Sequence, residues 1–320
     1  MVSNAFGENN KKLKIGILGA RGIGKVHARI FHSQGTIVHA ILGTNSKSAS
    51  DTALDISNSY GFKPLSFHKI EDLLNEPIDA VVICTPPHLH YEQILTVFNK
   101  GLPVFCEKPL FWEKNNSIKD VYSKLKTLKT HPNRRFFLNA PSALFLDEIR
   151  DRIGATNNIS SVKFSFYTNG QYKGIDIGED ILTHGISIIY KLFGFQQLSA
   201  FIWNITEKKY SCSFKYGTCK VEFDFREDPT GSKFFALDVD GRVFKRIQEG
   251  FGATYNIYFH DSATDEKIKV NDPFEQSIKT FIEYCKKGAP IDADQFEEAE
   301  VIMSLMAECL IMSNNRIAYN

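Results

Sequence analysis

The chain has 320 residues, and its 38 Lys and Arg almost balance its 37 Asp and Glu, which leaves a formal net charge of +1. Without an excess of either sign, the protein lacks the large-scale field that would hold a nucleic acid or an anionic membrane, so we expect a small-molecule partner. The length is sufficient for two domains with stable interiors.

Neither the start of the chain nor its apolar stretches indicate export or membrane insertion. Residues 1–10 are polar and lack the apolar centre of a signal peptide, and no later stretch approaches the roughly 18 unbroken apolar residues of a membrane span. The six cysteines form no C-x-x-C pair, which favours free thiols in a reducing compartment, and no metal site is expected. We therefore predict a cytoplasmic protein with a short disordered tail over residues 1–11.

Between residues 12 and 139, short β-rich apolar runs alternate with amphipathic segments, the pattern of parallel strands joined by crossover helices. Strands are predicted over residues 13–18, 37–42, 80–85, 103–106 and 135–138. Helices are predicted over residues 27–33, 48–60, 70–75, 91–100 and 114–128. This order predicts an α/β domain with a doubly wound parallel Rossmann sheet, whose ligands lie beyond the carboxyl ends of the strands.

From residue 140 to residue 320 the pattern predicts a second domain of the α+β class. Strands are predicted over residues 161–167, 198–203, 211–214, 220–225 and 234–239, with hairpin-type turns at Tyr216-Gly217 and Asp240-Gly241. Helices are predicted over residues 180–193, 274–287 and 296–312. We expect an aromatic-rich, open-faced antiparallel or mixed sheet that packs helices on one face and exposes the other to a subunit partner.

The glycine-rich turn Gly19-Ala20-Arg21-Gly22-Ile23-Gly24 follows the first predicted strand and opens a helix, the context in which such a turn holds a dinucleotide. Gly19 permits the tight turn, Gly24 lets helix and strand approach, and free amides at the helix start can hold a pyrophosphate. Arg21 replaces the middle glycine of G-x-G-x-x-G, so its side chain must swing outward, helped by a backbone shift at Gly22. We predict cofactor contacts from Gly19, Arg21, Gly22, Ile23 and Gly24.

The second predicted strand ends in Gly43-Thr44-Asn45-Ser46-Lys47, without the acidic residue that NAD enzymes usually present to the ribose hydroxyls. The missing carboxylate removes repulsion toward a 2'-phosphate, which Thr44, Ser46 and Lys47 can bond or neutralise. NADP is therefore favoured over NAD. We count Thr44, Asn45 and Lys47 among the cofactor contacts, and a polar loop without a ligand is the alternative interpretation.

Two runs supply a cation, a carboxylate and an imidazole: Cys106-Glu107-Lys108-Pro109-Leu110 and Asp180-Ile-Leu-Thr-His184. Asp180 and His184 are four residues apart, so on one helix they share a face. An imidazole with an ordinary pKa near ~6.5 suits a base that accepts an alcohol proton as hydride leaves carbon. Lys108 can donate to the same oxygen and stabilise its charge, while Asp180 orients Lys108 or the substrate.

Three motifs in this order resemble one known family. They are G-x-x-x-I-G-x-x-H-A from Gly19 to Ala28, T-P-P-x-x-H from Thr85 to His90, and G-x-x-V-x-x-E-K-P from Gly101 to Pro109. Together they resemble the family of glucose-fructose oxidoreductase, inositol dehydrogenase and the rhizopine-catabolism protein (Gfo/Idh/MocA). The resemblance is dense through residue 110 and thinner afterwards, where it depends on Asp180-x-x-x-His184 and the closing helices.

The resemblance implies an N-terminal Rossmann domain, a C-terminal open-faced sheet, and a cleft between them where nicotinamide and substrate meet. Lys108, Asp180 and His184 match the family's catalytic residues. Further cofactor contacts are expected from Thr85, Pro86, His90, Glu107 and Lys108, of which His90 orders the cofactor loop. The implied activity is NAD(P)-dependent hydride transfer between the nicotinamide and a secondary alcohol or ketone of a sugar, polyol or sugar derivative, in a homodimer or homotetramer.

Departures from the family pattern affect the substrate pocket. Asn139-Ala140-Pro141 lacks the basic residue that many relatives have there, and Ser187 stands where an Asp is common. The usual pyranose contacts therefore cannot be assumed. Candidates for substrate recognition are Tyr172, Lys173 and Asp176. The sequence also leaves open whether the bond before Pro109 is cis.

Two other functions compete with this interpretation. The chain could be a catalytically silent, cofactor-sensing regulatory protein of the same fold, although its retention of Lys108 and His184 argues against this. It could also be a reductase of a tetrapyrrole or of a carbon-carbon double bond, which would not need His184 as a base.

Overall fold

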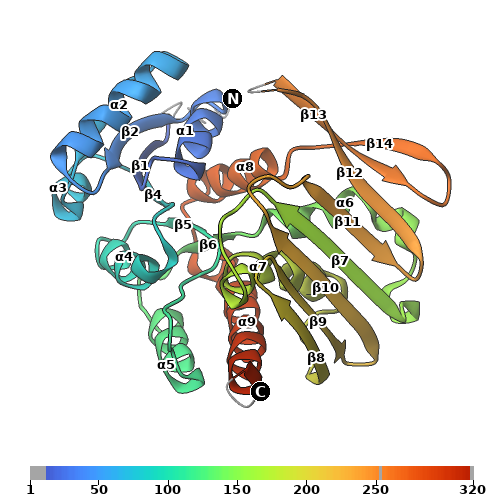
Figure 1. The fold of residues 1–320 in the computed structure, drawn as a ribbon. Coiled ribbons are helices and arrows are strands. Elements are labelled where there is room, and N and C mark those ends of the chain that lie inside the picture. The colour runs from blue at the N-terminus through green and yellow to red at the C-terminus, as the bar shows by residue number, and fades with distance from the viewer. Residues whose placement is uncertain (1–11, 252–253, 318–320) are drawn as a thin grey trace, which may run out of the picture.

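The structure, a computed structural model, describes residues 12–251 and 254–317. The tail over residues 1–11, which the sequence predicts to be disordered, lies outside the described residues. Two sheets and the helices that pack on them make up the described chain, and the sheets occupy opposite sides of the view in Figure 1.

The first half of the chain alternates strands and helices. Its strands are β1 (Lys14–Leu18), β2 (Ile37–Leu42), β3 (Leu65–Phe67), β4 (Ala80–Ile83), β5 (Val104–Glu107) and β6 (Phe136–Asn139). Its helices are α1 (Ile23–Ser33), α2 (Ser46–Tyr60), α3 (Ile70–Leu74), α4 (Pro87–Asn99) and α5 (Ile118–Lys129). The strands pair in parallel in the order β3-β2-β1-β4-β5-β6, which confirms the predicted doubly wound sheet. The order reverses between β1 and β4, so a ligand crevice opens at their carboxyl ends.

The second half forms a mixed sheet with helices, also as predicted. Its strands are β7 (Ser161–Thr168), β8 (Leu198–Thr206), β9 (Lys209–Tyr216), β10 (Cys219–Glu227), β11 (Phe234–Val239), β12 (Arg242–Phe251), β13 (Thr254–Asp261) and β14 (Glu266–Val270). Its helices are α6 (Pro141–Ile153), α7 (Ile175–Phe193), α8 (Pro273–Lys286) and α9 (Phe296–Ile317). The strand order is β14-β13-β12-β11-β7-β10-β9-β8, and within the described strands of this second sheet only the β7–β10 pairing is parallel.

Several elements escaped the sequence prediction. Helix α6 begins with Pro141 in its first turn and buries Phe145, Leu146 and Ile149, but this helix starts where the pattern indicated a domain boundary. Strands β3, β12, β13 and β14 were also not predicted. In β12, four charged residues among ten interrupt the apolar alternation that identifies a strand. Helix α7 begins at Ile175, five residues before its predicted start.

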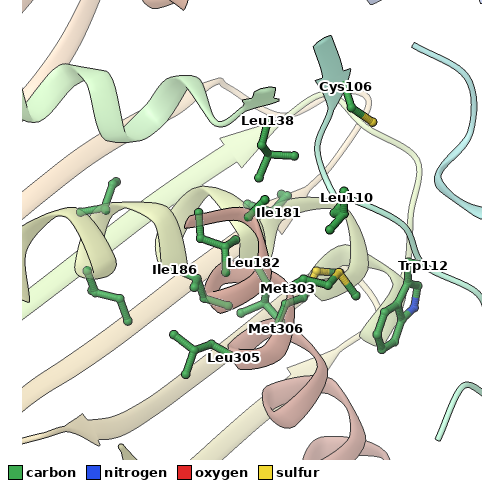
Figure 2. Packing of buried hydrophobic residues seen from close by; sticks show 14 of the residues in the cluster. Cys106, Leu110, Trp112, Leu138, Ile181, Leu182, Ile186, Met303, Leu305 and Met306 are labelled. Carbon is green, nitrogen blue, oxygen red and sulfur yellow. The ribbon is translucent and has the colours of Figure 1, made fainter. Parts of the chain in front are cut away.

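One hydrophobic core connects the loop after β5 to the helices of the second half. Leu110 and Trp112 are 1% and 7% exposed and belong to the same buried cluster as Ile181 on α7 and Met306 on α9. Figure 2 shows these side chains together, with α7 lying across α9. Because Leu110 is fixed in this core, the backbone of the preceding loop is held close to α7. This positions Lys108 on the loop relative to Asp180 on α7.

Candidate functional site

A cavity of about 1070 Å³ lies at the carboxyl ends of the parallel strands and is lined from both halves of the chain. The Rossmann half contributes residues at or just beyond the ends of β1, β4 and β5, among them Ile23, Thr85, Pro86, Glu107 and Lys108. The other half contributes residues of α6, α7, β12, β13 and the start of α8, among them Ser142, Asp180, His184, Arg246 and Tyr255. The cavity is therefore placed where a doubly wound sheet binds its ligand.

Lys108 and Asp180 meet in this cavity. Lys108 Nζ donates to Asp180 Oδ1 at 2.9 Å and to the backbone carbonyl of Asp180 at 2.8 Å. Burial works against both charges, yet the attraction between them holds the pKa of Lys108 above and the pKa of Asp180 below its ordinary value. The pair is thus an ammonium and a carboxylate at neutral pH, and Lys108 can give a hydrogen bond to an oxygen in the cavity without losing its proton. The Lys108–Pro109 peptide bond is cis.

His184 lines the same cavity one helical turn after Asp180. Its Nδ1 lies 2.9 Å from the Ser142 hydroxyl, and its ring packs edge-on against Phe166 at 5.2 Å between centroids. Burial and the nearby Lys108 ammonium lower the pKa of His184 to about 3, well below the ordinary value assumed from sequence. The imidazole is therefore neutral, and Nε2 is the nitrogen that Ser142 leaves available.

The sequence interpretation missed a second acid beside this pair, Glu227. The residue is 2% exposed, Oε2 accepts a hydrogen bond from the Tyr172 backbone N–H at 2.8 Å, and Oε1 is buried without a hydrogen-bond donor. Burial, together with repulsion from Asp180, raises the pKa of Glu227 to about 7 despite the Tyr172 hydrogen bond. The Asp180 carboxyl is the neighbour that can satisfy Oε1, and it does so when Glu227 carries a proton.

A signal for Glu227 was present in the sequence. Along β10 the alternate residues Val221, Phe223 and Phe225 are fully buried, and Glu227 continues this inward-facing series. An acidic side chain on the buried face of a strand must either be protonated or be paired with a hydrogen-bond donor or a cation. Gly170 makes room for it, because a Cβ at Gly170 would lie 1.9 Å from Glu227 Oε2.

The three candidates for substrate recognition fall in different places. Tyr172 and Asp176 line the cavity, and Asp176 accepts hydrogen bonds from Lys114 Nζ at 2.9 and 2.8 Å. Lys173 is directed to the surface, where it pairs with Glu207 at 2.5 Å, and it does not line the cavity. Lys173 is therefore not a substrate contact in this structure.

The glycine-rich turn has the shape that a pyrophosphate requires. Gly19 has a φ of +81°, and a Cβ at Gly24 would lie 2.0 Å from the Gly19 carbonyl oxygen, so strand and helix approach more closely than any side chain allows. Gly22 is the N-cap of α1 and supplies no side-chain cap, which leaves first-turn amides for an anion. Arg21 swings outward, with Nε 3.4 Å from the Thr52 hydroxyl on α2.

The residues after β2 have taken on local structural roles. Asn45 caps α2, its side chain accepting a hydrogen bond from the Ser48 N–H at 2.8 Å. Lys47 lies on α2 rather than in a loop, is exposed, and bonds Asp51 at 2.7 Å. Thr44 is exposed beside them. No carboxylate precedes α2 on this loop, whose side chains Thr44 and Asn45 are polar and exposed.

Two of the predicted cofactor contacts, His90 and Glu107, make hydrogen bonds to other groups of the protein. The ring nitrogens of His90 lie 2.9 Å from the Pro109 carbonyl oxygen and 2.7 Å from the Thr85 carbonyl oxygen. His90 is fully buried and its two ring nitrogens face these carbonyl groups, so it lies behind the loop rather than at the cavity surface. Glu107 faces the cavity, where its carboxylate lies 2.5 Å from His27 Nε2 and accepts a 2.6 Å hydrogen bond from Asn139.

The described residues contain neither a metal-binding cluster nor a membrane-spanning helix. No group of three or more His, Cys, Asp or Glu side chains is arranged to hold a metal ion there. Within residues 12–251 and 254–317, no helix is long and apolar enough to cross a bilayer.

The doubly wound sheet has the strand order of a dinucleotide-binding domain, and the cavity lies between it and the mixed sheet. Residues 13–135 match the profile of the Gfo/Idh/MocA family, described as an oxidoreductase family with an NAD-binding Rossmann fold. This match covers the N-terminal region in which the sequence resemblance to the same family is dense.

Relatives with known names agree at the level of the fold. The chain is 29% identical over 125 residues to inositol 2-dehydrogenase of Corynebacterium glutamicum, and the match spans 38% of this chain and only 36% of that protein. An oxidoreductase of Formosa agariphila is 22% identical over 93% of this chain and 89% of its own length. The crystal structure of myo-inositol 2-dehydrogenase from Lactobacillus plantarum superposes with a TM-score of 0.69 at 18% identity, covering 95% and 98% of the two chains.

Proposed function

We propose that the protein transfers a hydride between a nicotinamide cofactor, preferably NADP, and a secondary alcohol or ketone of a sugar, polyol or sugar derivative. The observation that carries the proposal is the Lys108–Asp180 pair at 2.9 Å in one cavity with the neutral His184 ring. The match of the N-terminal region to inositol 2-dehydrogenase supports a polyol-like substrate.

Three side chains carry the proton and charge steps of the oxidation. Nε2 of His184 accepts the hydroxyl proton, and the Lys108 ammonium donates a hydrogen bond to the oxygen as it gains negative charge. Asp180 keeps Lys108 in place and charged, as their 2.9 Å contact allows. When bound, the dinucleotide supplies the ring that accepts the hydride, so the O–H and C–H bonds are exchanged for a C=O bond. The reverse reduction uses the same groups.

The cofactor would be held by backbone at one end and by basic side chains at the other. The pyrophosphate fits the uncapped first turn of α1. Arg21, lying against α2 through its contact with Thr52, and the exposed Lys47 flank the position of the adenosine ribose, and no acid precedes α2 to repel a 2'-phosphate. These contacts support NADP over NAD.

Fluorescence titration of the protein with NADPH and NADH, followed by a screen of sugars, polyols and sugar acids on the loaded protein, tests the proposal. We expect NADPH to bind at least ~10-fold more tightly than NADH, the scale of one lost charged contact. Arg21→Ala should weaken NADPH binding about 10-fold and leave NADH binding nearly unchanged. Absence of binding by either dinucleotide would refute the function, and equal loss for both in Arg21→Ala would refute the NADP preference.

We further propose that the protein is a homodimer or homotetramer that uses the outer face of the second sheet. Assembly through this face rests on the family resemblance, and a second copy there would remove the 67% exposed Ile202 of the edge strand β8 from water. Light scattering coupled to size-exclusion chromatography measures the subunit number directly, and a monomer at micromolar concentration would contradict this assembly.

A further inference from the structure

Three basic side chains of the Lys and Arg type line the cavity, and only two of them are neutralised by the protein. Lys108 pairs with Asp180, and Lys114 pairs with Asp176. The third, Arg246 on β12, makes no ion pair or hydrogen bond with any residue that the structure describes. A guanidinium presents five N–H donors, so Arg246 can donate hydrogen bonds to an acceptor that enters the cavity.

Aromatic rings hold Arg246 in position without using its hydrogen bonds. The guanidinium carbon lies 4.8 Å from the centre of the Phe235 ring and 5.9 Å from the centre of the Phe166 ring. Such contacts occupy the flat faces of a guanidinium and leave its N–H edge free. Phe166 also packs against His184, so the unused donors lie one aromatic ring away from the proposed base.

The acidic groups near Arg246 are already engaged. Asp272 attracts the guanidinium, but its carboxylate caps α8 by accepting from the Phe274 N–H at 2.9 Å and also accepts a hydrogen bond from the Tyr255 hydroxyl. His184 is neutral and gives Arg246 no negative partner. Burial, offset in part by Tyr255 and Asp272, lowers the pKa of Arg246, the direction expected for a charge that has lost water without gaining a counter-ion.

Resting on the function proposed above, we infer that Arg246 binds a carboxylate of the substrate, which is therefore a hydroxy acid of the sugar-acid or polyol-acid class. The carboxylate is held at the wall of the second sheet while the reacting hydroxyl reaches His184 and Lys108. A carboxylate offers two oxygens in the plane of the guanidinium fork and one negative charge, which a single arginine matches. A phosphate would call for further donors, and the other lysines of the cavity are paired.

Matched substrates that differ only in the acid group test this inference. We will compare glucuronate with glucose, gluconate with glucitol, and glucose 6-phosphate as the phosphate probe, all with the cofactor-loaded protein. For an acid that is turned over, we expect kcat/KM to exceed that of its neutral partner about 100-fold, as a charged hydrogen bond allows. Preference for the phosphate over both carboxylates would overturn the assignment to a carboxylate.

Variants locate the effect on Arg246. Arg246→Gln should raise KM for the acid about 100-fold with kcat little changed, and Arg246→Lys should restore part of the loss. Lys245→Gln is the matched control, because Lys245 is the adjacent, exposed residue of the same strand and lies over Phe234. A fall in kcat/KM that is equal for acid and neutral substrates in Arg246→Gln would make the residue structural and overturn the inference.

A binding measurement separates this inference from the function on which it rests. Quenching of bound NADPH fluorescence by glucuronate and gluconate reports the carboxylate site whether or not either acid is oxidised. If the wild type and Arg246→Gln show the same affinity for these acids, or none, the carboxylate site is refuted. If NADPH binds and neutral polyols are oxidised in a Lys108-dependent manner, the proposed oxidoreductase function nevertheless stands.

Discussion

The Rossmann half of the cavity presents backbone amides at a tight turn, whereas the second half presents side chains from a helix and from strands far apart in sequence. Gly19, Gly22 and Gly24 lie within six residues, and their role follows from local geometry. Asp180 on α7 and Arg246 on β12 line the cavity, and Glu227 on β10 lies beside Asp180, so the fold of the second half brings together residues far apart in sequence. A cofactor common to many enzymes can be held by a short motif, while a particular substrate is recognised by a pattern that the whole fold assembles.

The largest effect should separate chemistry from cofactor binding. Lys108→Met and His184→Ala each remove a group that acts on the reacting oxygen, so we expect kcat to fall about 1000-fold with NADPH affinity within a few-fold of the wild type. Stopped-flow turnover and fluorescence titration measure the two quantities on the same preparation. Lys114→Met is the control for Lys108, since Lys114 lines the same cavity but pairs with Asp176. Wild-type turnover in both Lys108→Met and His184→Ala would end the mechanistic assignment.

A substitution in the glycine-rich turn should have the opposite effect, weakening cofactor binding while turnover at saturating cofactor is retained. In Gly24→Ala the new Cβ would lie 2.0 Å from the Gly19 carbonyl oxygen, so the strand and helix must separate. We expect NADPH binding to weaken about 30-fold, the scale of a strain of about 2 kcal/mol. At saturating NADPH, turnover should recover. Ser33→Ala, at the far and exposed end of the same helix, serves as the control. If Gly24→Ala binds NADPH normally, the turn is not the pyrophosphate site.

The same contrast explains how much could be predicted from the sequence. The Rossmann strands and Lys108 could be identified locally because each motif lies within a few residues of a strand end. Asp180 and His184 could be paired because four residues separate them on a helix. Arg246 could not be recognised, because β12 reads as a charged stretch and its meaning depends on Phe166 and Phe235 from other strands.

Other errors have equally physical causes. The burial of His90 against two carbonyl groups could not be predicted either, because the spacing of its motif does not reveal it. The pKa of His184 was taken as ordinary, because sequence does not reveal burial beside the Lys108 ammonium. Helix α6 was not predicted because it begins with a proline at the point where the periodicity changes, although proline is favourable in the first turn of a helix.

The smallest expected effect, a change in melting temperature, tests whether Glu227 and Asp180 share a proton. Raising the pKa of Glu227 from 4.5 in the unfolded chain to about 7 in the folded protein means that the folded state binds the proton more tightly. This contribution to the free energy of unfolding is complete below pH 4.5 and is lost as the pH rises through 7. Glu227→Gln keeps an amide that can donate to Asp180 and accept from Tyr172 without ionising. The variant should therefore melt a few degrees above the wild type at pH 8, about 1 to 2 kcal/mol, and match it near pH 5.

The readout is the difference in melting temperature between pH 5 and pH 8, measured by calorimetry for both proteins. Glu222→Gln is the matched control, because Glu222 lies on the same strand but faces outward and pairs with Lys163 at 2.7 Å. It removes a carboxylate without touching Asp180, so its pH dependence should follow that of the wild type. A Glu227→Gln variant whose melting temperature parallels the wild type across this range would mean that Glu227 is already ionised at pH 5. Asp180 and Glu227 would then both be carboxylates that repel each other beside the Lys108 ammonium, and they would share no proton.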